Sequence, residues 1–338
     1  MNSTANHDLP PFLAPKKAMI TGIAGQDGSY LAELLFGKGY EVYGIDKSID
    51  NLSDKTKDSI TSLFAIDLIQ PKLIKSLILD IAPDEIYHLA AYHFSTQQDG
   101  NRLNSFLPFN AINLLVTNEI LETINKTLSN CRFFFASSSH IFGNVDHYPQ
   151  NEKTPYKPES FYAITKAAGN ELCRFFRAFH NVYASVGILY NHESPHRPLS
   201  FVTAQIAEAA AKASLGLPVK LFLKDINAIV DWGAAQDYVN AMWLTLQRNS
   251  SDDYIIASGK PHSIREFSKI AFAHFGLNYK DYVFQEPSAN ICPRIPLIGD
   301  SSKLKNECKW TQQIGFHDLV IEMVNAHLNR LSQDFDKQ

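Results

Sequence analysis

Three glycines spaced three residues apart, Gly22, Gly25 and Gly28, constrain what this 338-residue chain can fold into more than any other feature. An apolar run over residues 17–22, typical of a buried strand, leads into them, and a helical run over residues 29–37 follows. This order of strand, glycine turn and helix lets backbone N–H groups and the helix dipole meet a pyrophosphate with no side chain in the way. The pattern therefore predicts a dinucleotide-binding turn at the first strand of an α/β sheet.

The residue that ends the second predicted strand indicates which dinucleotide binds. This strand, over residues 41–46, ends in Asp46, about twenty residues beyond the glycine turn. A carboxylate there suits the ribose 2′-hydroxyl of NAD and repels the 2′-phosphate of NADP. The sequence favours NAD, with NADP possible, and an ordinary turn acid is the alternative for Asp46.

Strands alternate with helical segments from residue 17 to about residue 190, which predicts a parallel sheet covered on both faces. The candidate strands are 17–22, 41–46, 85–90, 132–138 and 182–189, and the candidate helices are 71–81, 108–128 and 162–180. Further helices are predicted at 201–215, 234–247, 263–275 and 315–330, with short strands near 219–222 and 253–257. We therefore expect an α/β protein with a Rossmann-type doubly wound parallel sheet over residues 17–190. Residues 191–338 should form mainly a smaller, mixed α/β substrate domain, with some segments returning to the first domain.

The overall composition excludes several classes of protein. The chain is 45% hydrophobic and 20% charged, enough to bury a large core. Its net charge of −4 offers no basic stripe for a nucleic acid. No apolar run approaches the roughly 20 residues that cross a bilayer. We expect neither a nucleic-acid partner nor a membrane segment.

The N-terminus and the cysteines indicate a cytoplasmic protein. The first residues lack the charged-then-apolar order of a signal peptide, and residues 1–16, which hold three prolines, are predicted to be a flexible leader. The cysteines have the spacing of neither zinc ligands nor a disulfide framework, so we expect reduced thiols and no metal site. They are Cys131, Cys173, Cys292 and Cys308.

A tyrosine and a lysine four residues apart, Tyr162 and Lys166, lie on one face of a predicted helix. The lysine cation is expected to lower the pKa of the phenol from about 10 toward working pH, so that the tyrosinate can take a proton from a substrate hydroxyl. The alternative is a packed tyrosine beside a surface lysine, because this spacing is common in helices. The glycine turn favours the catalytic interpretation.

The motifs of this chain, taken in order, resemble those of the extended short-chain dehydrogenase/reductases. They are the glycine triplet, Asp67-Leu68, His88-Leu89-Ala90-Ala91, the serine run before Gly143, and the Tyr162/Lys166 pair. Within that group, four longer stretches resemble the GDP-mannose 4,6-dehydratase family, and the similarity extends over residues 17–330. These stretches lie at residues 21–33, 187–195, 201–203 and 231–239.

The resemblance implies the residues of the site. Cofactor contacts are expected from Gly22, Gly25, Gln26, Asp27, Gly28, Asp46, Asp67, Leu68, Leu89, Ala90, Ala91, Tyr162 and Lys166. Substrate contacts are expected from Tyr92, His93, Asn191, His192, Glu193, Arg197, Val202, Lys220 and Arg294. In this family a hydride leaves C4 of a nucleotide-linked sugar, water is lost across C5 and C6, and the hydride returns to C6. The resemblance implies Tyr162 as the base at O4, Lys166 as its partner and Ser138 as a hydroxyl bridging to O4.

Several positions depart from the family pattern. The glutamate that takes the C5 proton is replaced by His140, whose imidazole can serve as a general acid or base, contact the substrate, or be merely structural. Cations that hold the diphosphate are replaced by Val230 and by Ala204-Gln205. The family's arginine-rich NADP loop is replaced by residues 46–51, which supports NAD and questions the family's tetramer.

These residues lead to one main hypothesis, a dehydratase that converts a nucleotide sugar, GDP-linked by resemblance, to a 4-keto-6-deoxy sugar. The alternatives are a C4 epimerase or 4-keto reductase of the same family, which need no glutamate, and a dinucleotide-binding sensor without turnover. An apolar face on the helices at 108–128 and 162–180 favours a homodimer, with a tetramer possible.

Overall fold

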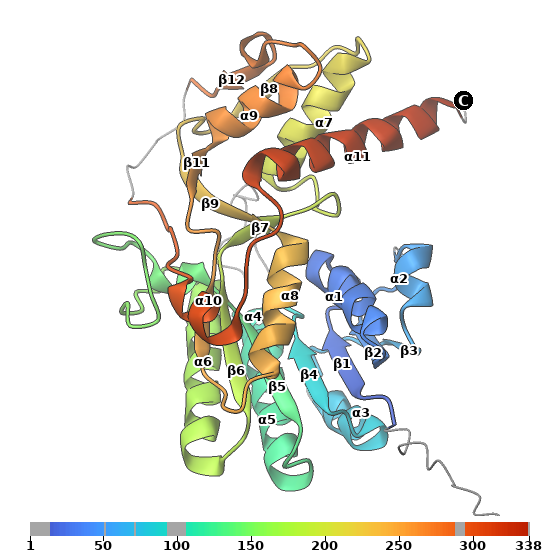
Figure 1. Cartoon of the computed structure of the whole chain (residues 1–338), viewed down its shortest axis with the longest axis vertical. Helices are drawn as coiled ribbons and strands as arrows, with labels where there is room; N and C mark the ends of the chain where they lie inside the picture. Colours follow the sequence, from blue (N-terminus) through green and yellow to red (C-terminus); the bar gives the residue numbers. More distant parts are fainter. Residues whose placement is uncertain (1–13, 51, 71, 93–105, 288–294, 337–338) are drawn as a thin grey trace, which may run out of the picture.

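The computed structural model describes residues 14–50, 52–70, 72–92, 106–287 and 295–336. At its centre lies a seven-stranded parallel sheet in the order β10-β6-β5-β4-β1-β2-β3 (Figure 1). The strands are β1 (Lys17–Thr21), β2 (Glu41–Asp46), β3 (Ser62–Ala65), β4 (Glu85–His88), β5 (Arg132–Ser138), β6 (Ala184–Leu189) and β10 (Asp253–Ile256). The strand order runs outward in opposite directions from β1 and β4. Open sheets bind ligands at such a switch point, outside the carboxyl ends of the strands.

Helices cover both faces of this sheet, and most residues of its central strands are buried for that reason. One face carries α1 (Gln26–Gly37), α8 (Ala235–Leu246) and α10 (Ser302–Cys308), and the other carries α3 (Lys72–Ile81), α5 (Val116–Thr127) and α6 (Phe161–His180). Strand β5 illustrates the alternation, because Phe134 packs toward α8 while Phe133 and Phe135 pack toward α5 and α6. The prediction of a doubly wound parallel sheet is confirmed.

A smaller core lies above the carboxyl ends of the sheet (Figure 1). Its helices are α7 (Val202–Ser214), α9 (Ile264–Ala273) and α11 (Phe316–Asp336), and its strands form two small sheets in the orders β11-β9-β7 and β12-β8. These strands are β7 (Asn191–Glu193), β8 (Leu221–Leu223), β9 (Ile229–Ala234), β11 (Pro261–Ser263) and β12 (Val283–Gln285). Only Tyr190 separates β6 from β7, so the chain passes directly from the main sheet into the smaller core.

The structure differs from the sequence predictions at several places. Strand β3 and the short helix α2 (Asp54–Asp58) lie where neither was predicted, because both are too short to carry a clear period. The helix predicted over 108–128 is divided into α4 (Leu107–Asn110), a π-helical turn η1 (Ala111–Leu115) and α5. Strand β10 comes from the C-terminal part of the chain, where some segments were expected to return to the first domain, and it pairs with β6 in the main sheet.

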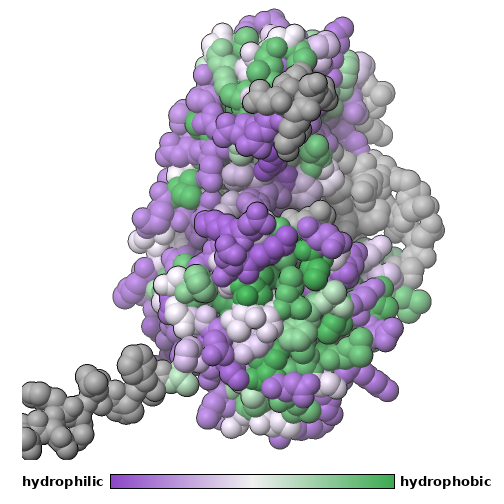
Figure 2. All heavy atoms as spheres, turned by 90° about the vertical axis from the view of Figure 1, so that its right-hand side faces the viewer, coloured by the Kyte–Doolittle hydropathy of each residue, from purple (hydrophilic) through white to green (hydrophobic). Residues whose placement is uncertain are grey.

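Figure 2 looks onto the side of the molecule that carries β3 and shows apolar side chains gathered on its lower half. Helix α3 lies on this side, and its Leu73 and Leu79 are exposed, as is Ile69 just before it. Exposed apolar groups of this kind mark contact surfaces when they form a continuous patch.

The N-terminal end of the described chain lies against the bottom of the sheet. Of the leader predicted over residues 1–16, residues 1–13 lie outside the described part, and Lys16 Nζ lies 3.3 Å from the carboxylate of buried Glu85. Within the described ranges, no helix is both long and apolar enough to cross a membrane.

A buried acid on β10 anchors this edge strand to α6. The Asp253 carboxylate is almost fully buried and accepts hydrogen bonds from Arg174 at 2.6 Å and Arg177 at 2.8 Å, both on α6. Arg174 also pairs with exposed Glu171 at 2.6 Å. Because α6 carries Tyr162 and Lys166, these ion pairs hold the helix of the predicted catalytic pair in place.

We expect Asp253→Asn to lower the free energy of unfolding by about 2–3 kcal/mol, because two guanidinium groups lose a buried charged partner. Urea unfolding followed by circular dichroism measures the change. The matched control is Glu171→Gln, which removes the exposed partner of the same Arg174 and should cost less than about 0.5 kcal/mol. Equal losses in the two variants would contradict the anchoring role.

Candidate active site

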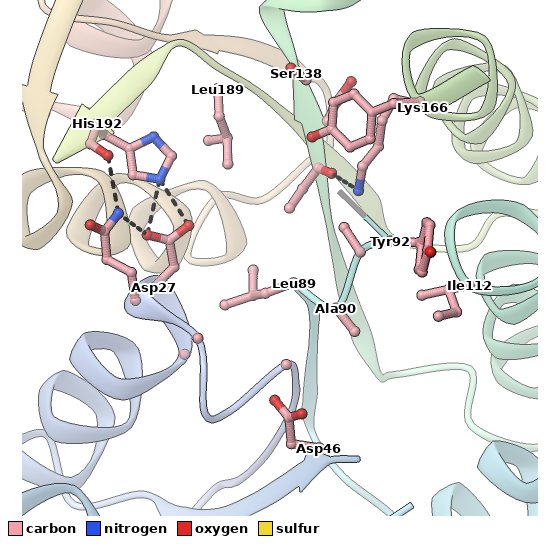
Figure 3. A pocket seen from close by; sticks show the side chains of 18 of the residues that line it. Asp27, Asp46, Leu89, Ala90, Tyr92, Ile112, Ser138, Lys166, Leu189 and His192 are labelled. Carbon is pink, nitrogen blue, oxygen red and sulfur yellow. Dashed lines mark hydrogen bonds and ion pairs between the residues drawn. The ribbon is translucent and has the colours of Figure 1, made fainter. Parts of the chain in front are cut away.

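A pocket of about 400 Å³ opens at the carboxyl ends of the main sheet (Figure 3). Most of the predicted site residues line it, although they come from distant parts of the chain, because the ends of parallel strands meet at one edge. They are Gly22, Gly25, Gln26, Asp27, Gly28, Asp46, Asp67, Leu68, Leu89, Ala90, Ala91, Tyr92, Ser138, His140, Tyr162, Lys166, Asn191, His192 and Arg197. Asp46, the Asp27–His192 pair and the Ser138–Lys166 group lie at three corners, with Leu89 and Ala90 between them (Figure 3).

The glycine turn is pressed against the end of β4. Gly22 has a φ of +77°, and a Cβ there would lie 2.7 Å from the backbone nitrogen of Ala90. A Cβ on Gly28 would lie 2.3 Å from the carbonyl oxygen of Gly22. Both approaches are too close for any side chain, so glycine is needed both where the turn meets the end of β4 and where α1 meets the turn.

Asp46 at the end of β2 is held by the backbone of the same turn. Its carboxylate accepts the N–H of Ala24 at 3.1 Å and that of Lys47 at 2.8 Å. These bonds fix the acid beside the glycine turn, at the edge of the pocket. Lys47 lines the pocket next to it, so a cation stands beside the predicted ribose-binding acid.

The three residues of the predicted catalytic group come from β5 and α6. Helix α6 begins after Ser160, whose hydroxyl accepts the N–H of Ala163 at 3.1 Å, and this cap places Tyr162 in the first turn. A hydrogen bond links the Tyr162 and Ser138 hydroxyls. Lys166 is 1% exposed and donates from Nζ to the carbonyl oxygen of Ala136 at 2.7 Å.

The expectation that the Lys166 cation lowers the pKa of the Tyr162 phenol is wrong for this structure. Burial raises the pKa of Tyr162 to about 12, and the groups that lower it are the Ser138 hydroxyl and the Arg197 cation. Burial also lowers the pKa of Lys166 to about 7. A buried amine that is only partly protonated at neutral pH supplies little charge, so Arg197 is the cation that acts on the phenol.

His140 lies on the pocket wall in a short 3₁₀ turn, η2 (Ser139–Phe142). Its ring stands edge-on to Tyr162, with centroids 6.1 Å apart, and its backbone N–H donates to Ser138 Oγ at 3.3 Å. The side chain of His140 is exposed, and the partial loss of water caused by the neighbouring protein groups lowers the pKa of the imidazole. His140 is therefore a neutral base near pH 7, next to the predicted catalytic tyrosine.

The buried base His88, behind the pocket, takes part in a structural network. It is fully buried, its Nδ1 lies 2.7 Å from Thr21 Oγ1, and its Nε2 lies 3.2 Å from the carbonyl oxygen of Ile112 in the π-helical turn. Burial lowers the pKa of His88 to about 3, so the imidazole is neutral. The histidine therefore links β1 and β4 to η1.

Predicted cofactor and substrate residues meet at the first turn of α1. Asp27, expected to contact the cofactor, pairs with His192, expected to contact the substrate, at 2.8 Å (Figure 3). Gln26 Nε2 donates to the carbonyl oxygen of His192 at 3.0 Å, and Ser194 donates to Gln26 Oε1 at 2.8 Å. The two halves of the protein are thus joined beside the glycine turn.

The remaining predicted substrate residues are placed differently. Glu193 is buried behind the pocket, where its carboxylate lies 3.0 Å from Arg197 and accepts a hydrogen bond from Thr203 at 2.7 Å. Val202 begins α7, and exposed Lys220 precedes β8 in the smaller core; neither lines the pocket. His93 and Arg294 lie outside the described residues.

Sequence reasoning missed several residues that line the pocket. They are Lys47, Ile66, Ile112, Ala136, Ser137, Ser139, Leu189, Tyr190, Pro198 and Phe201. Most stand at or just after the carboxyl end of a strand, which is a signal that was available for β2, β5 and β6 but not for the unpredicted β3. Among the described residues, no three His, Cys, Asp or Glu side chains are grouped so as to hold a metal ion.

We expect Lys166→Met to raise the free energy of unfolding by about 1–2 kcal/mol at pH 7, because it removes a buried amine whose charged form is disfavoured. The folded pKa of about 7 lies below the unfolded value, so the unfolded chain binds more protons above pH 7. The stability of the wild type then rises with pH, and the difference narrows toward about pH 9.

Urea unfolding of both proteins at the two pH values tests this expectation. The control is Lys157→Met, since Lys157 is half exposed and pairs with exposed Asp146. A less stable Lys166 variant, or a difference that widens with pH, would contradict the stated cost of the buried amine.

Comparison with known proteins agrees with this geometry. The chain matches the family model of GDP-mannose 4,6 dehydratase over residues 19–323. It is 38% identical over 333 residues to GDP-mannose 4,6 dehydratase 2 of Arabidopsis thaliana, a match that covers 93% of this chain and 87% of the relative.

Two solved structures share the fold. RMD from Pseudomonas aeruginosa, solved with NADPH, has a TM-score of 0.78 at 21% identity and covers 94% of this chain and 100% of that chain. The dTDP-glucose 4,6-dehydratase of Bacillus anthracis, solved with NAD, has a TM-score of 0.78 at 18% identity and covers 94% and 98%. Because the family match extends from β1 into α11, across the whole pocket, the chain belongs to the GDP-mannose 4,6-dehydratase family.

Proposed function

We propose that this protein is a nicotinamide-dependent nucleotide-sugar dehydratase that converts GDP-mannose to its 4-keto-6-deoxy product. The observation that carries the proposal is that Ser138 and Lys166 lie at one corner of a pocket whose opposite side is a glycine turn (Figure 3). Tyr162 joins them there, because it is hydrogen-bonded to Ser138 and its ring centroid lies 5.8 Å from Lys166 Nζ. Packing alone does not require these three polar groups together. The Arabidopsis relative, 38% identical, is named for the same reaction.

The turn after β1 fits a dinucleotide. Gly25 and Gly28 leave bare backbone at the start of α1, where a Cβ would lie 3.2 Å and 2.3 Å from the Gly22 carbonyl oxygen. Asp46 and Lys166 would hold the two riboses, and Leu89 and Ala90 the apolar rings between them. When bound, the nicotinamide supplies hydride chemistry, taking a hydride from C4 of the sugar and returning it at C6.

Tyr162 takes the proton of the C4 hydroxyl as the hydride leaves C4, and the Ser138 hydroxyl, hydrogen-bonded to the phenol, orients O4. Tyr162 must be the tyrosinate to accept this proton, and the Arg197 cation favours that form. The resulting 4-ketone makes the C5 proton acidic. The proton taken by Tyr162 balances the one that C5 regains at the end of the cycle, so the net loss is one water.

His140 fits the elimination step in place of the family's glutamate. Its neutral imidazole accepts the C5 proton and then donates a proton to the departing 6-hydroxyl, so one group serves as base and acid. The position supports this role, because His140 stands beside Tyr162 on the pocket wall. Its lowered pKa keeps it unprotonated near pH 7, as a base requires.

We expect purified protein incubated with GDP-mannose and NAD to give a product lighter by one water, detected by mass spectrometry. Tyr162→Phe and His140→Gln should each lower kcat by roughly 100- to 10,000-fold, because each removes a proton-transfer group. His140→Glu restores the family's acid and should keep dehydration within about tenfold of wild type.

Other products would contradict the proposal in defined ways. A product of unchanged mass with inverted C4 would identify an epimerase, and net consumption of NADH would identify a reductase. Full activity of His140→Gln would remove His140 from the mechanism. Tight NAD binding without any turnover of nucleotide sugars would identify a sensor.

We propose NAD as the preferred cofactor because Asp46 is fixed at the ribose corner by two backbone N–H groups. The expected preference over NADP is at least tenfold in dissociation constant, because the carboxylate repels a 2′-phosphate. When Asp46 is replaced, Lys47 remains in the pocket lining, and its cation attracts a 2′-phosphate. Asp46→Ala should reduce or reverse this preference. Fluorescence titration with NADH and NADPH measures it, and an unchanged ratio in the variant would contradict the role of Asp46.

We propose a cytoplasmic homodimer built on α6, with a tetramer as the alternative. Ile164, Phe175 and Phe179 are exposed along one side of this helix, and Leu115 is exposed on η1 nearby. A second copy would cover this stripe by antiparallel pairing of the same helices. The cytoplasmic assignment rests on the described cysteines, Cys131, Cys173 and Cys308, which are free and buried.

A further inference from the structure

The imidazole of His192 is enclosed by hydrogen-bond acceptors. Its Nε2 lies 2.8 and 2.9 Å from the two carboxylate oxygens of Asp27, and its Nδ1 lies 2.7 Å from the carbonyl oxygen of Tyr190. A carbonyl oxygen and an ionised carboxylate only accept, so both ring nitrogens must carry a hydrogen to satisfy these contacts. Only the imidazolium has two N–H groups.

We propose that His192 is held as an imidazolium that neutralises Asp27 and latches the glycine turn to β7, so that its protonation sets how tightly the site holds a dinucleotide. His192 acts here as a positioning residue. The proposal concerns the free protein, and its effect on affinity rests on the dinucleotide-binding function proposed above.

Asp27 explains why a positive partner is needed at this place. It is the second residue of α1, and it lines the pocket where the N–H groups of the helix start face an anionic ligand. An uncompensated carboxylate there would repel a pyrophosphate. Pairing with an imidazolium cancels that charge and leaves the backbone N–H groups to bind the phosphates.

The same residues also connect the start of α1 to β7 through hydrogen bonds. Gln26 and Asp27, the first two residues of α1, both bind β7, through the His192 carbonyl oxygen and the His192 ring. The ring of Tyr238 on α8 stacks on His192 with centroids 4.5 Å apart, which fixes the imidazole in plane. Losing the ring proton would therefore loosen the cofactor turn from the strand that begins the substrate side.

The charges around His192 favour its protonated form on balance. Burial alone would lower its pKa and Arg197 opposes protonation, but the Asp27 carboxylate and the Tyr190 carbonyl raise the pKa above its ordinary value. Glu193 pairs with Arg197 and reduces that opposition. Burial would raise the pKa of Asp27, yet His192 lowers it.

The direction of the pH dependence follows from these shifts. The contribution of the pair is fully present below the unfolded histidine pKa of about 6.5 and is lost as pH rises through the higher folded value. At the acid end it is lost only as pH falls through the lowered pKa of Asp27. Dinucleotide affinity should therefore be highest in mildly acidic to neutral solution and fall on the alkaline side.

The first experiment measures the protonation of His192 without any ligand. Nuclear magnetic resonance of protein labelled with isotope-enriched histidine should show both ring nitrogens of His192 protonated at about pH 6.5, with a titration midpoint above that of free histidine. Asp27→Asn should move the midpoint down. A singly protonated ring at pH 6.5, or a midpoint unaffected by Asp27→Asn, would overturn the proposal.

The second experiment follows NADH binding by fluorescence between about pH 6 and pH 9. Wild-type affinity should fall roughly tenfold over this range. His192→Gln should bind weakly and with little pH dependence, because Asp27 keeps its charge unmasked. The double variant Asp27→Asn/His192→Gln should bind more tightly than His192→Gln alone, since the repulsive charge is gone.

This rescue separates an electrostatic role from a packing role. If His192 only filled space, the second substitution would add to the loss, and that result would overturn the proposal. The matched control is His317→Gln, whose exposed ring stands 3.6 Å from Asp318 at the start of α11 and should leave the pH profile unchanged. Failure of the wild type to bind NADH at any pH would contradict the proposed function and the effect on affinity, whereas the imidazolium is decided by the resonance titration alone.

Discussion

The close approach of the glycine turn to β4 is the constraint on which the site depends. Strand β1 is central in the sheet, and the chain leaves it at Gly22 with a φ of +77°, within contact distance of the Ala90 backbone. One added methyl group on Gly22 would push the turn away from the end of β4, because the nearest atoms are backbone and cannot rotate aside. The positions of Asp46, which binds the turn through Ala24, and of Asp27 at the start of α1 follow from this approach.

Burial shifts several titratable groups of the pocket toward their neutral forms, and the exception is the pair of Asp27 and His192 at the start of α1. Tyr162 and Lys166 are both shifted toward their neutral forms, and so is His140. The shift brings the pKa of Lys166, about 7, close to working pH, whereas the pKa of Tyr162, about 12, lies far above it. At the first turn of α1 the pKa of Asp27 is lowered and that of His192 is raised, so both favour their charged forms, because each has its partner within hydrogen-bond distance.

The main sheet and most of the pocket lining were predictable because both depend on local patterns. Apolar strands covered on two faces stand out against amphipathic helices, and residues at the carboxyl ends of parallel strands converge whatever lies between them. Strand β3 has only four residues, and the π-helical turn in 108–128 keeps the apolar spacing of a helix, so neither has a sequence signal. The pairing of Asp27 with His192, 165 residues apart, depends on the placement of β7 and was not accessible from spacing.

The departures from the family pattern change side chains within a retained scaffold. Ala204 and Val230 stand where the family has cations, but Ala204 is fully buried in α7 and Val230 packs against the smaller core. These positions face packed apolar groups here, so the positive charge near the predicted sugar site must come from elsewhere.

Arg197 is the arginine that lines the pocket within the described chain, stacked 3.6 Å over the Phe201 ring and held by Glu193. The same guanidinium favours the Tyr162 anion, so under the proposed function phosphate recognition and activation of the phenol would fall on one side chain. A substrate diphosphate that engaged it would weaken its hold on the tyrosinate. Under the proposed function, substrate binding and proton transfer would therefore be coupled through Arg197.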